Sequence, residues 1–296
     1  MDNIGILFAG PEDHNLETTF NNIDKNYIIR NINYAEEYYN HIIEPISKKF
    51  NIFIFVTCFS EEKKLWENNW KNIINEKKNP NIKLFCIEIC NTLPDNIRFT
   101  QKNNYHIGNR FNDKYHNQYG KLNNTFNVMK KYENTNQIKM NYLIKGRSDF
   151  IYKDLFDINW LLNLPKDTIC IPSTEWHTPD RWMERTNQSQ KNKKIGVIYP
   201  GGMSDQMIFE YRDDMAYIFD IVSCNEKSPP GKIHPEYILY QNLIVTNKKK
   251  ILTCEFQFKK PWIGSFATTN NSEGSTPNDP WVKIKSTLVW DGNCLL

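Results

Sequence analysis

The sequence alternates between dense apolar runs and segments with helical periodicity, and this alternation limits the folds open to the chain. Three runs are short and almost continuously apolar: IGILFAG (4–10), NIFIFVTCF (51–59) and IKLFCIEI (82–89). The segments YAEEYYNHIIEPISKKF (34–50) and SEEKKLWENNWKNIIN (60–75) lie between them. Continuous apolar strands joined by helices are typical of a parallel sheet that is covered on both faces. This part of the chain therefore predicts a β-α-β-α-β unit.

Local signals refine the two helices. Pro45 lies within the apolar periodicity of the first helix and predicts a kink or an early end there. The second helix is expected to begin with Ser60, with Glu62 in its first turn as an N-terminal signal.

The rest of the chain continues the α/β pattern. After a polar loop (91–112) we expect a helix over QYGKLNNTFNVMKKYE, a return to the sheet over NYLIKGRSDFIY, and strands over TICIPS and ILTCEFQF. IGVIYPGGMSDQMIFEY reads as a strand, a Gly-Gly turn and a helix that starts at Ser204, and HPEYILYQNLIV as a further helix. Residues 174–194 resemble a lid or surface loop, and 264–279 a flexible tail.

No repeat or linker divides the sequence, so we expect one domain over residues 1–296. Its predicted parts are a nucleotide-binding half (1–150), an acceptor or catalytic half (151–262) and a tail (263–296). The predicted fold class is α/β, with a mostly parallel, Rossmann-like sheet flanked by helices and a C-terminal elaboration.

Composition excludes several classes of function. A net charge of +3 is too weak a bias to indicate a nucleic-acid-binding protein. The seven cysteines are odd in number, scattered and without a CxxC pair, which argues against a zinc site or a disulfide framework. No signal peptide and no apolar stretch long enough for a membrane span is present, so we expect a soluble, cytoplasmic protein.

Charge gathers at the end of one expected strand. In YLIKGRSDFIY, the residues Lys145, Gly146, Arg147 and Asp149 interrupt an otherwise apolar run. Ligands of open α/β sheets bind beyond the carboxyl ends of the strands. Asp149 could hold Mg²⁺ or Mn²⁺ there, with Lys145 and Arg147 facing a diphosphate. Alternatively, Arg147 and Asp149 form a structural ion pair at the rim of the sheet.

This arrangement resembles a group of nucleotide-sugar glycosyltransferases with the GT-A fold, found in bacterial surface-polysaccharide clusters and in large DNA viruses. The resemblance rests on the QYGKL helix before the strand, on KGRSD at its end in place of R-x-R-x-D, on SDQ at 204–206, and on the PE of HPEY. These four pieces occur in the family's order between about residues 4 and 245. Lys145 replaces the first arginine of the motif, and AGPEDH lacks the arginine that the family often has there.

The resemblance implies roles for individual residues. Asp149 would bind a Mn²⁺ or Mg²⁺ ion that bridges the donor phosphates, with His234 or His177 completing the coordination. Asp205 would be the general base for the acceptor hydroxyl; alternatively it binds the acceptor sugar, or Ser204–Gln206 only cap a helix. The remaining donor- or substrate-binding candidates are Gly10, Thr57, Lys145, Arg147, Trp176, Gln206 and Glu236.

Trp176 lies in the lid-like loop with His177, Arg181 and Trp182, which together could form a platform for an acceptor sugar or could simply pack the loop. Glu236 is expected to organise the site rather than to catalyse.

Two functional hypotheses follow. The first is a metal-dependent glycosyltransferase that moves a hexosyl or deoxyhexosyl group from a nucleoside-diphosphate sugar to a glycan or glycoconjugate hydroxyl. The second is a non-catalytic sugar-nucleotide or glycan-binding protein on the same fold. P-loop phosphotransferases, Rossmann dinucleotide enzymes and serine hydrolases are excluded, because the sequence lacks GxxxxGK[ST], a GxGxxG after the first strand, and GxSxG.

Overall fold

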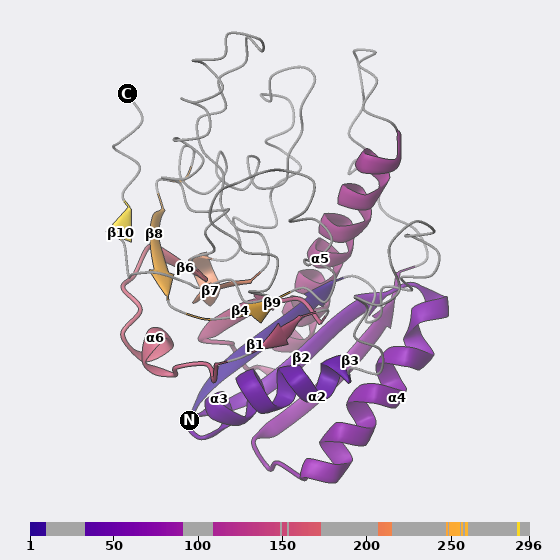
Figure 1. Ribbon diagram of the computed structural model, residues 1–296, viewed down its shortest axis with the longest axis horizontal. Coiled ribbons are helices and arrows are strands. Elements are labelled where there is room, and N and C mark those ends of the chain that lie inside the picture. The colour runs from indigo at the N-terminus through magenta and orange to yellow at the C-terminus, as the bar shows by residue number, and fades with distance from the viewer. Residues whose placement is uncertain are drawn as a thin grey trace, which may run out of the picture.

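The computed structural model describes residues 1–9, 33–90, 109–148, 150–152, 154–172, 207–214, 247, 249–254, 256, 258–259 and 289–290, and the fold is that of these residues. They form an eight-stranded sheet in the order β10-β8-β6-β7-β4-β1-β2-β3 (Figure 1). Its strands are β1 (Asp2–Ala9), β2 (Phe50–Cys58), β3 (Ile82–Ile89), β4 (Tyr142–Gly146), β6 (Thr168–Pro172), β7 (Ile208–Tyr211), β8 (Lys250–Cys254) and β10 (Val289–Trp290).

The sheet is mostly parallel. β3, β2, β1 and β4 pair in parallel in that order, and β6 pairs in parallel with β8. β7 runs antiparallel to both β4 and β6, and β10 runs antiparallel to β8. A second, two-stranded sheet joins β5 (Ile151–Tyr152) to β9 (Phe258–Lys259). The predicted α/β class, with a mostly parallel sheet flanked by helices, is confirmed.

Helices cover both faces of the parallel half (Figure 1). One face carries α2 (Tyr34–Tyr38), a π-helical stretch η2 (Tyr39–Ile43), α3 (Glu44–Ser47) and α4 (Ser60–Lys77). The other carries α5 (Asn109–Asn136), and the short α6 (Asn159–Leu162) follows β5. Two glycines mark the faces: a Cβ on Gly5 would meet Met129 of α5, whereas one on Gly146 would meet Tyr38 of α2.

The core on the α4 face is aromatic. Phe8 of β1 lies 4.7 Å from the ring of Tyr38, 5.5 Å from that of Trp66 and 5.3 Å from that of Trp70. All four side chains are fully buried. Trp66 and Trp70 are one helical turn apart on α4, so both face the sheet. This packing explains why a helix with so many charged residues forms here.

Pro45 does not end its helix. The chain passes from α2 through the π-helical stretch η2 into α3, and Glu44 donates its N–H to the Tyr39 carbonyl. Proline has no N–H for the carbonyl four residues earlier, which belongs to His41. The N–H of Phe156 takes that place, with a donor–acceptor distance of 2.8 Å. The proline therefore leaves a hydrogen-bond acceptor that anchors the segment after β5.

The second helix begins at Ser60 as predicted: Phe59 is the N-cap of α4, and its N–H donates to the Glu62 carboxylate at 2.8 Å. Two other helix boundaries differ from the sequence prediction. α5 begins at Asn109, inside the expected polar loop. The helix predicted to start at Ser204 does not extend over 208–211, because these residues are the central strand β7.

Two strand predictions also needed correction. Phe150–Tyr152 is not the continuation of β4, because Ile151 and Tyr152 pair with β9 in the second sheet. ILTCEFQF is divided between β8 and β9. The expected strand at 195–199, the helix at 234–245, the lid-like loop 174–194 and the tail 264–279 lie outside the described residues.

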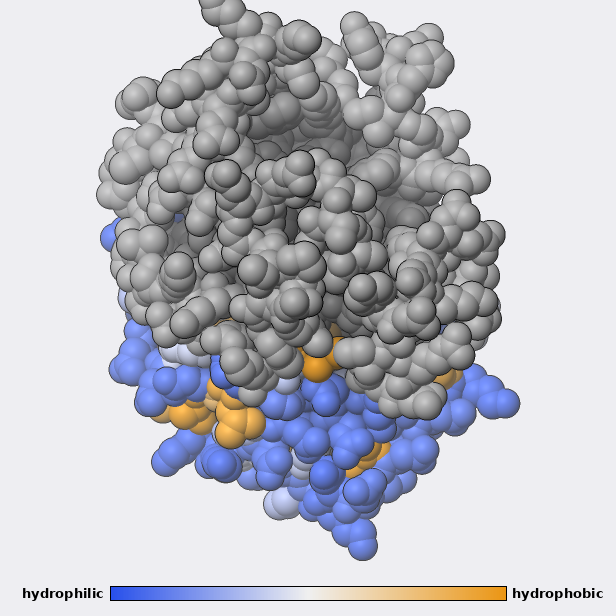
Figure 2. All heavy atoms as spheres, viewed as in Figure 1, coloured by the Kyte–Doolittle hydropathy of each residue, from blue (hydrophilic) through white to orange (hydrophobic). Residues whose placement is uncertain are grey.

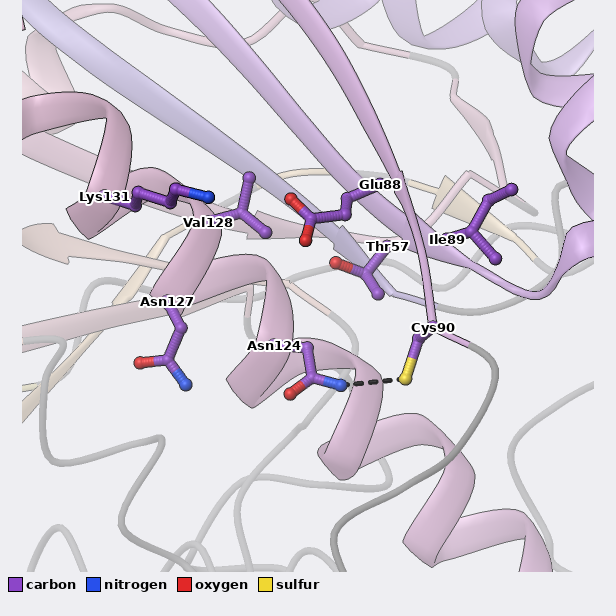
Figure 3. Close-up of a pocket in the computed structure, with 8 residues that line it drawn as sticks. All are labelled: Thr57, Glu88, Ile89, Cys90, Asn124, Asn127, Val128 and Lys131. Atoms are coloured by element: carbon purple, nitrogen blue, oxygen red, sulfur yellow. Dashed lines mark hydrogen bonds between the residues drawn. The ribbon is translucent and has the colours of Figure 1, made fainter. Parts of the chain in front are cut away.

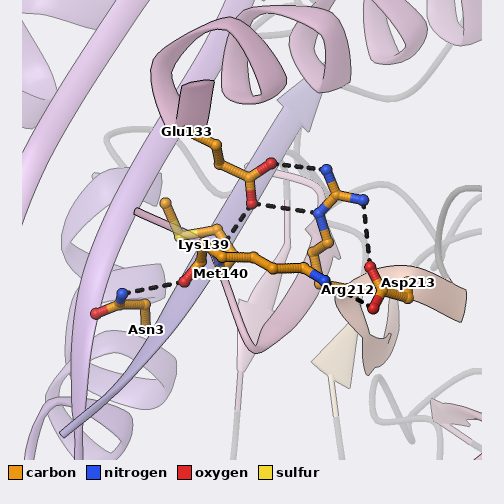
Figure 4. Close-up of polar contacts among 6 residues, drawn as sticks. All are labelled: Asn3, Glu133, Lys139, Met140, Arg212 and Asp213. Atoms are coloured by element: carbon orange, nitrogen blue, oxygen red, sulfur yellow. Dashed lines mark hydrogen bonds and ion pairs between the residues drawn. The ribbon is translucent and has the colours of Figure 1, made fainter. Parts of the chain in front are cut away.

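An ion-pair network joins α5 to β7 at the amino edge of the parallel strands (Figure 4). The Arg212 guanidinium contacts both carboxylate oxygens of Glu133, at 2.7 Å and 3.2 Å, and Glu133 also accepts the N–H of Met140. Lys139 and Asp213 form a neighbouring pair at 2.8 Å that is largely exposed. The network fixes the end of α5 against the strand that follows β4 in the sheet.

The surface of the described part seen in Figure 2 is mostly hydrophilic, with small hydrophobic areas. Cys58, Cys86, Cys90, Cys170 and Cys254 are free thiols. Within the described ranges, no helix has the length and hydropathy that a membrane span requires.

Candidate functional site

The topology of the sheet points to the carboxyl ends of β1 and β4. From β1 the chain adds β2 and then β3 on one side, and it places β4 on the other. Such a reversal of strand order is where open α/β sheets bind ligands. In this protein the two neighbouring strands end at Ala9 and Gly146.

Lys145 is the last but one residue of β4, and only 1% of it is exposed. Its register neighbours are Leu7 on β1 and Ile208 on β7. Lysine is almost never fully buried unless its ammonium group is paired, because an unpaired buried charge costs several kcal/mol. Lys145 is engaged by neighbouring groups. Its side chain is therefore held inside the end of the strand by interactions with its neighbours.

Arg147 follows directly after β4 and is half-buried. Its guanidinium lies 5.5 Å from the centre of the Phe150 ring, a cation–π distance. Its backbone carbonyl accepts a hydrogen bond from the Tyr152 hydroxyl at 3.3 Å. The arginine is thus held at the strand end by the residues that lead into β5.

Gly146 separates these two cations and packs against the core. A Cβ at this position would lie 2.5 Å from the Tyr38 hydroxyl oxygen and 3.0 Å from Phe8. The Tyr38 hydroxyl is buried and has no hydrogen-bond partner among the described residues, and burial raises its pKa above the usual range. The side chain that approaches this glycine closely is therefore Tyr38.

A second buried lysine lies near the end of β2. Lys121 of α5 is 2% exposed, and its ammonium nitrogen is 2.8 Å from the Glu62 carboxylate. The same nitrogen lies 3.7 Å from the centre of the Phe59 ring. Glu62 also caps α4, so this ion pair joins α5 to the start of α4 above β2.

Thr57, also near the end of β2, lines a pocket of about 360 Å³ (Figure 3). β3 and the residue after it contribute Glu88, Ile89 and Cys90, and the remaining wall comes from α5. Asn124 of α5 donates a hydrogen bond from its side-chain nitrogen to the sulfur of Cys90 at 2.8 Å. The pocket therefore lies between α5 and the edge strand β3.

Three of the predicted site residues are described, and all three lie near the carboxyl edge of the parallel strands. Lys145 and Arg147 are neighbours at the end of β4, whereas Thr57 is on β2, separated from β4 by β1. The other predicted residues lie outside the described ranges: Gly10, Asp149, Trp176, Asp205, Gln206, His234 and Glu236, together with His177. Their roles stay predictions.

No group of three or more His, Cys, Asp or Glu side chains that could hold a metal ion occurs in the part of the chain that the structure describes. The described side chains at the end of β4 that carry charge are cationic. Cations suit phosphate oxygens and not a metal ion, so neither side chain is a metal ligand, and the predicted ligand Asp149 lies outside the described residues.

Neither the pocket nor the position of the Tyr38 hydroxyl was predicted from the sequence. The pocket draws on three segments that are far apart in the sequence, and its α5 residues read as an ordinary polar flank of an amphipathic helix. Tyr38 lies in a segment with helical apolar periodicity, and the sequence does not indicate that its hydroxyl reaches the end of β4. Only the spacing of Asn124, Asn127 and Lys131 at three and four residues could have marked one common helix flank.

No protein-family model matches the sequence, and no curated protein matches it at a significant level. Among solved structures, the apo form of mouse xyloside xylosyltransferase 1 is similar with a TM-score of 0.41 and 9% identity, covering 86% of this chain and 84% of that one. A nucleoside-diphosphate-sugar pyrophosphorylase from Vibrio cholerae RC9 gives 0.40 and 8%, covering 84% and 89%. The apo structure of the bifunctional glycosyltransferase WbbM gives 0.37 and 10%, covering 82% of this chain and 37% of that one. These are distant likenesses, so an assignment of function rests on the residues of this chain.

Proposed function

We propose that this protein is a metal-dependent glycosyltransferase that moves a sugar from a nucleoside-diphosphate sugar to a hydroxyl of a glycan or glycoconjugate. The observation that carries the proposal is the pair Lys145 and Arg147 at the end of β4, where the strand order of the sheet reverses. A nucleoside-diphosphate sugar presents a diphosphate, and the leaving group gains negative charge as the glycosidic bond breaks. Two cations at the end of a core strand, one in it and one just after it, are suited to stabilise that charge.

The two cations differ in what they offer. Lys145 is buried inside the strand end, so it contributes a fixed positive potential that is little screened by solvent. Arg147 is half-buried and carries a planar fork of donors that matches phosphate oxygens. We therefore assign the direct contact with the phosphates or the sugar to Arg147 and a supporting field to Lys145.

A divalent metal is part of the proposal through Asp149, with His234 or His177 expected to complete its coordination. When bound, Mn²⁺ or Mg²⁺ would neutralise charge on the diphosphate. Asp149 follows Arg147 by two residues, and Ser148 between them is 5% exposed. In the sequence, Asp149 therefore follows closely on both cations.

The transfer needs a group that takes the proton from the acceptor hydroxyl. The acceptor hydroxyl oxygen would form a bond to the anomeric carbon, the bond from that carbon to the diphosphate would break with its electron pair, and the hydroxyl proton would pass to Asp205. Gly10 and Gln206 would contact the donor, Trp176 would face the acceptor sugar, and Glu236 would organise the site.

The proposal is tested by nucleoside-diphosphate release from a panel of sugar nucleotides with Mn²⁺, with and without glycan acceptors. We expect Arg147→Ala to lower kcat/KM roughly 100-fold, as loss of one donor to developing charge does. Lys139→Ala is the matched control, because it removes a cation from the exposed pair at the opposite edge of the sheet. It should leave kcat/KM unchanged.

The alternative is a non-catalytic sugar-nucleotide or glycan-binding protein on the same fold. It is favoured if the folded wild type binds a sugar nucleotide but releases no nucleoside diphosphate from any donor. A wild type that binds no sugar nucleotide of the panel and releases no nucleoside diphosphate would contradict the transferase hypothesis and would leave glycan binding as the alternative.

A further inference from the structure

The pocket between α5 and β3 is separated from the end of β4 by the body of α5. Its α5 wall consists of Asn124, Asn127, Val128 and Lys131, which share one flank of the helix. The opposite flank faces β7: Glu133 pairs with Arg212, and the Arg212 guanidinium lies 5.5 Å from the centre of the Phe126 ring. The pocket is therefore a different place from the proposed diphosphate site.

The floor of the pocket holds a polar group that the folded chain leaves unsatisfied. Thr57 is 1% exposed, and its hydroxyl oxygen has no hydrogen-bond partner among the described groups. Figure 3 shows this hydroxyl among the lining side chains that face the pocket. A buried hydroxyl without a partner costs about 1–3 kcal/mol, so proteins seldom keep one at a pocket unless something binds to it.

The other polar groups complete a wall of mixed donors and acceptors. Asn124 uses its side-chain nitrogen on Cys90, which leaves its carbonyl oxygen as an acceptor. Asn127 adds a carboxamide, Glu88 a carboxylate and Lys131 an ammonium group. Opposite charges on one rim do not select an ion of either sign.

The size and composition of the pocket narrow the class of ligand. No aromatic side chain is among the lining residues that the structure describes, so a nucleobase would find no ring to stack on among them. The Lys131 ammonium group disfavours a metal ion in this pocket, and the Glu88 carboxylate disfavours phosphate. A volume of about 360 Å³ lies at the lower end of the range for ligand pockets. It suits one small ring rather than a nucleotide sugar.

We infer that this pocket binds a monosaccharide unit, whose neighbouring hydroxyls pair with Thr57, Asn124, Asn127 and Glu88. It is a second carbohydrate site on the chain, outside the proposed transfer site, and it takes no part in the chemistry at the end of β4. This inference assigns Thr57 to the second site instead of to the donor. It does not require that the protein be a transferase.

The test is saturation-transfer NMR and titration of the full-length protein with D-glucose, D-galactose, D-mannose and N-acetyl-D-glucosamine, without nucleotide or metal. We expect at least one of them to bind in the millimolar range. Thr57→Val keeps the shape of the side chain and removes the hydroxyl, and it should weaken that binding about tenfold. Because the wild-type hydroxyl is unsatisfied, the same variant should be at least as stable as the wild type without ligand.

Asn127→Ala provides a second variant on the exposed rim and should also weaken binding without affecting folding. Lys139→Ala, in the exposed pair at the opposite edge of the sheet, is the control and should leave sugar binding unchanged. Binding that is insensitive to Thr57→Val and Asn127→Ala would overturn the inference, as would the absence of binding by every sugar. Uridine or guanosine binding that is lost in Thr57→Val, with no sugar bound, would overturn it in favour of a nucleoside pocket. Because the probes carry no phosphate, failure here leaves the proposed transfer function standing.

Discussion

Gly146 is the residue at which the core and the candidate site meet. It lies between the two cations of β4, while its own face is filled by Tyr38 and Phe8. Tyr38 cannot move away easily, because its ring packs against Phe8 at 4.7 Å and Tyr152 at 5.8 Å. The position of the cations therefore depends on a packing contact on the opposite side of the sheet.

We predict that Gly146→Ala lowers the free energy of unfolding by about 1–3 kcal/mol, the usual cost of overpacking a core. Tyr38→Phe alone should be close to neutral, since the hydroxyl that it removes has no partner among the described residues. In the Tyr38→Phe background the glycine substitution should cost less, because the nearest atom is gone. Urea denaturation of the four proteins measures this, and an equal cost in both backgrounds would show that Tyr38 is not the obstacle.

Glu210 is a buried carboxyl group on the central strand β7, and its ionisation affects the stability of the protein. It is fully buried, and neither carboxylate oxygen has a hydrogen-bond partner among the described groups. Burial raises the pKa of this carboxyl well above its usual range; the Asp214 carboxylate raises it further, and the Lys249 ammonium lowers it. The folded protein therefore keeps a proton on Glu210 at a pH where the unfolded chain has lost it.

The raised pKa of Glu210 makes the free energy of unfolding depend on pH. Below the ordinary glutamate pKa of about 4.3, both states are protonated and Glu210 costs nothing through ionisation. As the pH rises above that value, the unfolded state ionises first, so the free energy of unfolding falls until the raised folded pKa is reached. Glu210→Gln should be more stable than the wild type at pH 7, by roughly 1–3 kcal/mol, and the difference should vanish near pH 4. Denaturant melts at both pH values decide this; a difference that does not change with pH would refute it.

At the scale of the elements, α5 and β7 connect the parallel strands β3, β2, β1 and β4 to the remaining strands of the sheet. The Arg212–Glu133 pair that connects them is largely buried, with side-chain exposures of 17% and 6%. The hydrogen bond to Glu133 raises the pKa of Arg212, which keeps the pair charged. Removing one member leaves the other as an uncompensated charge.

Arg212→Met should therefore lower the free energy of unfolding by about 3–5 kcal/mol. Adding Glu133→Gln to this variant should recover part of the loss, because the stranded carboxylate is then gone. Lys139→Ala, which breaks the exposed neighbouring pair, should change stability by less than about 0.5 kcal/mol. Additive effects of the Arg212 and Glu133 substitutions in urea melts would show that the pair is not coupled.

The elements also show what a sequence can predict. IGILFAG, NIFIFVTCF and IKLFCIEI became β1, β2 and β3 within a residue or two, because strands buried on both faces are continuously apolar. Ile208–Tyr211 was placed in a helix, because four residues are too few to show a period and Ser204 looked like a helix cap. Burial between β4 and β6 decided its conformation, and that is a tertiary effect.

For the whole molecule, the predicted alternation of strands and helices is confirmed in the parallel strands β1, β2 and β3, whereas a ligand at their carboxyl edge stays a prediction. The position of Lys145 and Arg147 at the end of a core strand was predicted correctly, since a charged run after an apolar one marks a strand end. The pocket was not, because Thr57, Glu88 and Asn124 meet only when β2, β3 and α5 pack together. A charged strand end can be predicted from one segment of sequence. A pocket formed between separate elements cannot be predicted in this way.

The central claim is that the end of β4 binds a nucleoside diphosphate through a metal. Its most direct test is the melting temperature of the wild type with UDP, GDP, CDP or dTDP, each with and without Mn²⁺, beside Asp149→Asn and the control Lys139→Ala. A ligand at about 100 times its Kd adds about 2.7 kcal/mol to the free energy of unfolding. We predict that one nucleotide raises the melting temperature only with Mn²⁺, that Lys139→Ala keeps the shift and that Asp149→Asn loses it. A wild type that no nucleotide stabilises, or a shift that persists in Asp149→Asn, would contradict the claim.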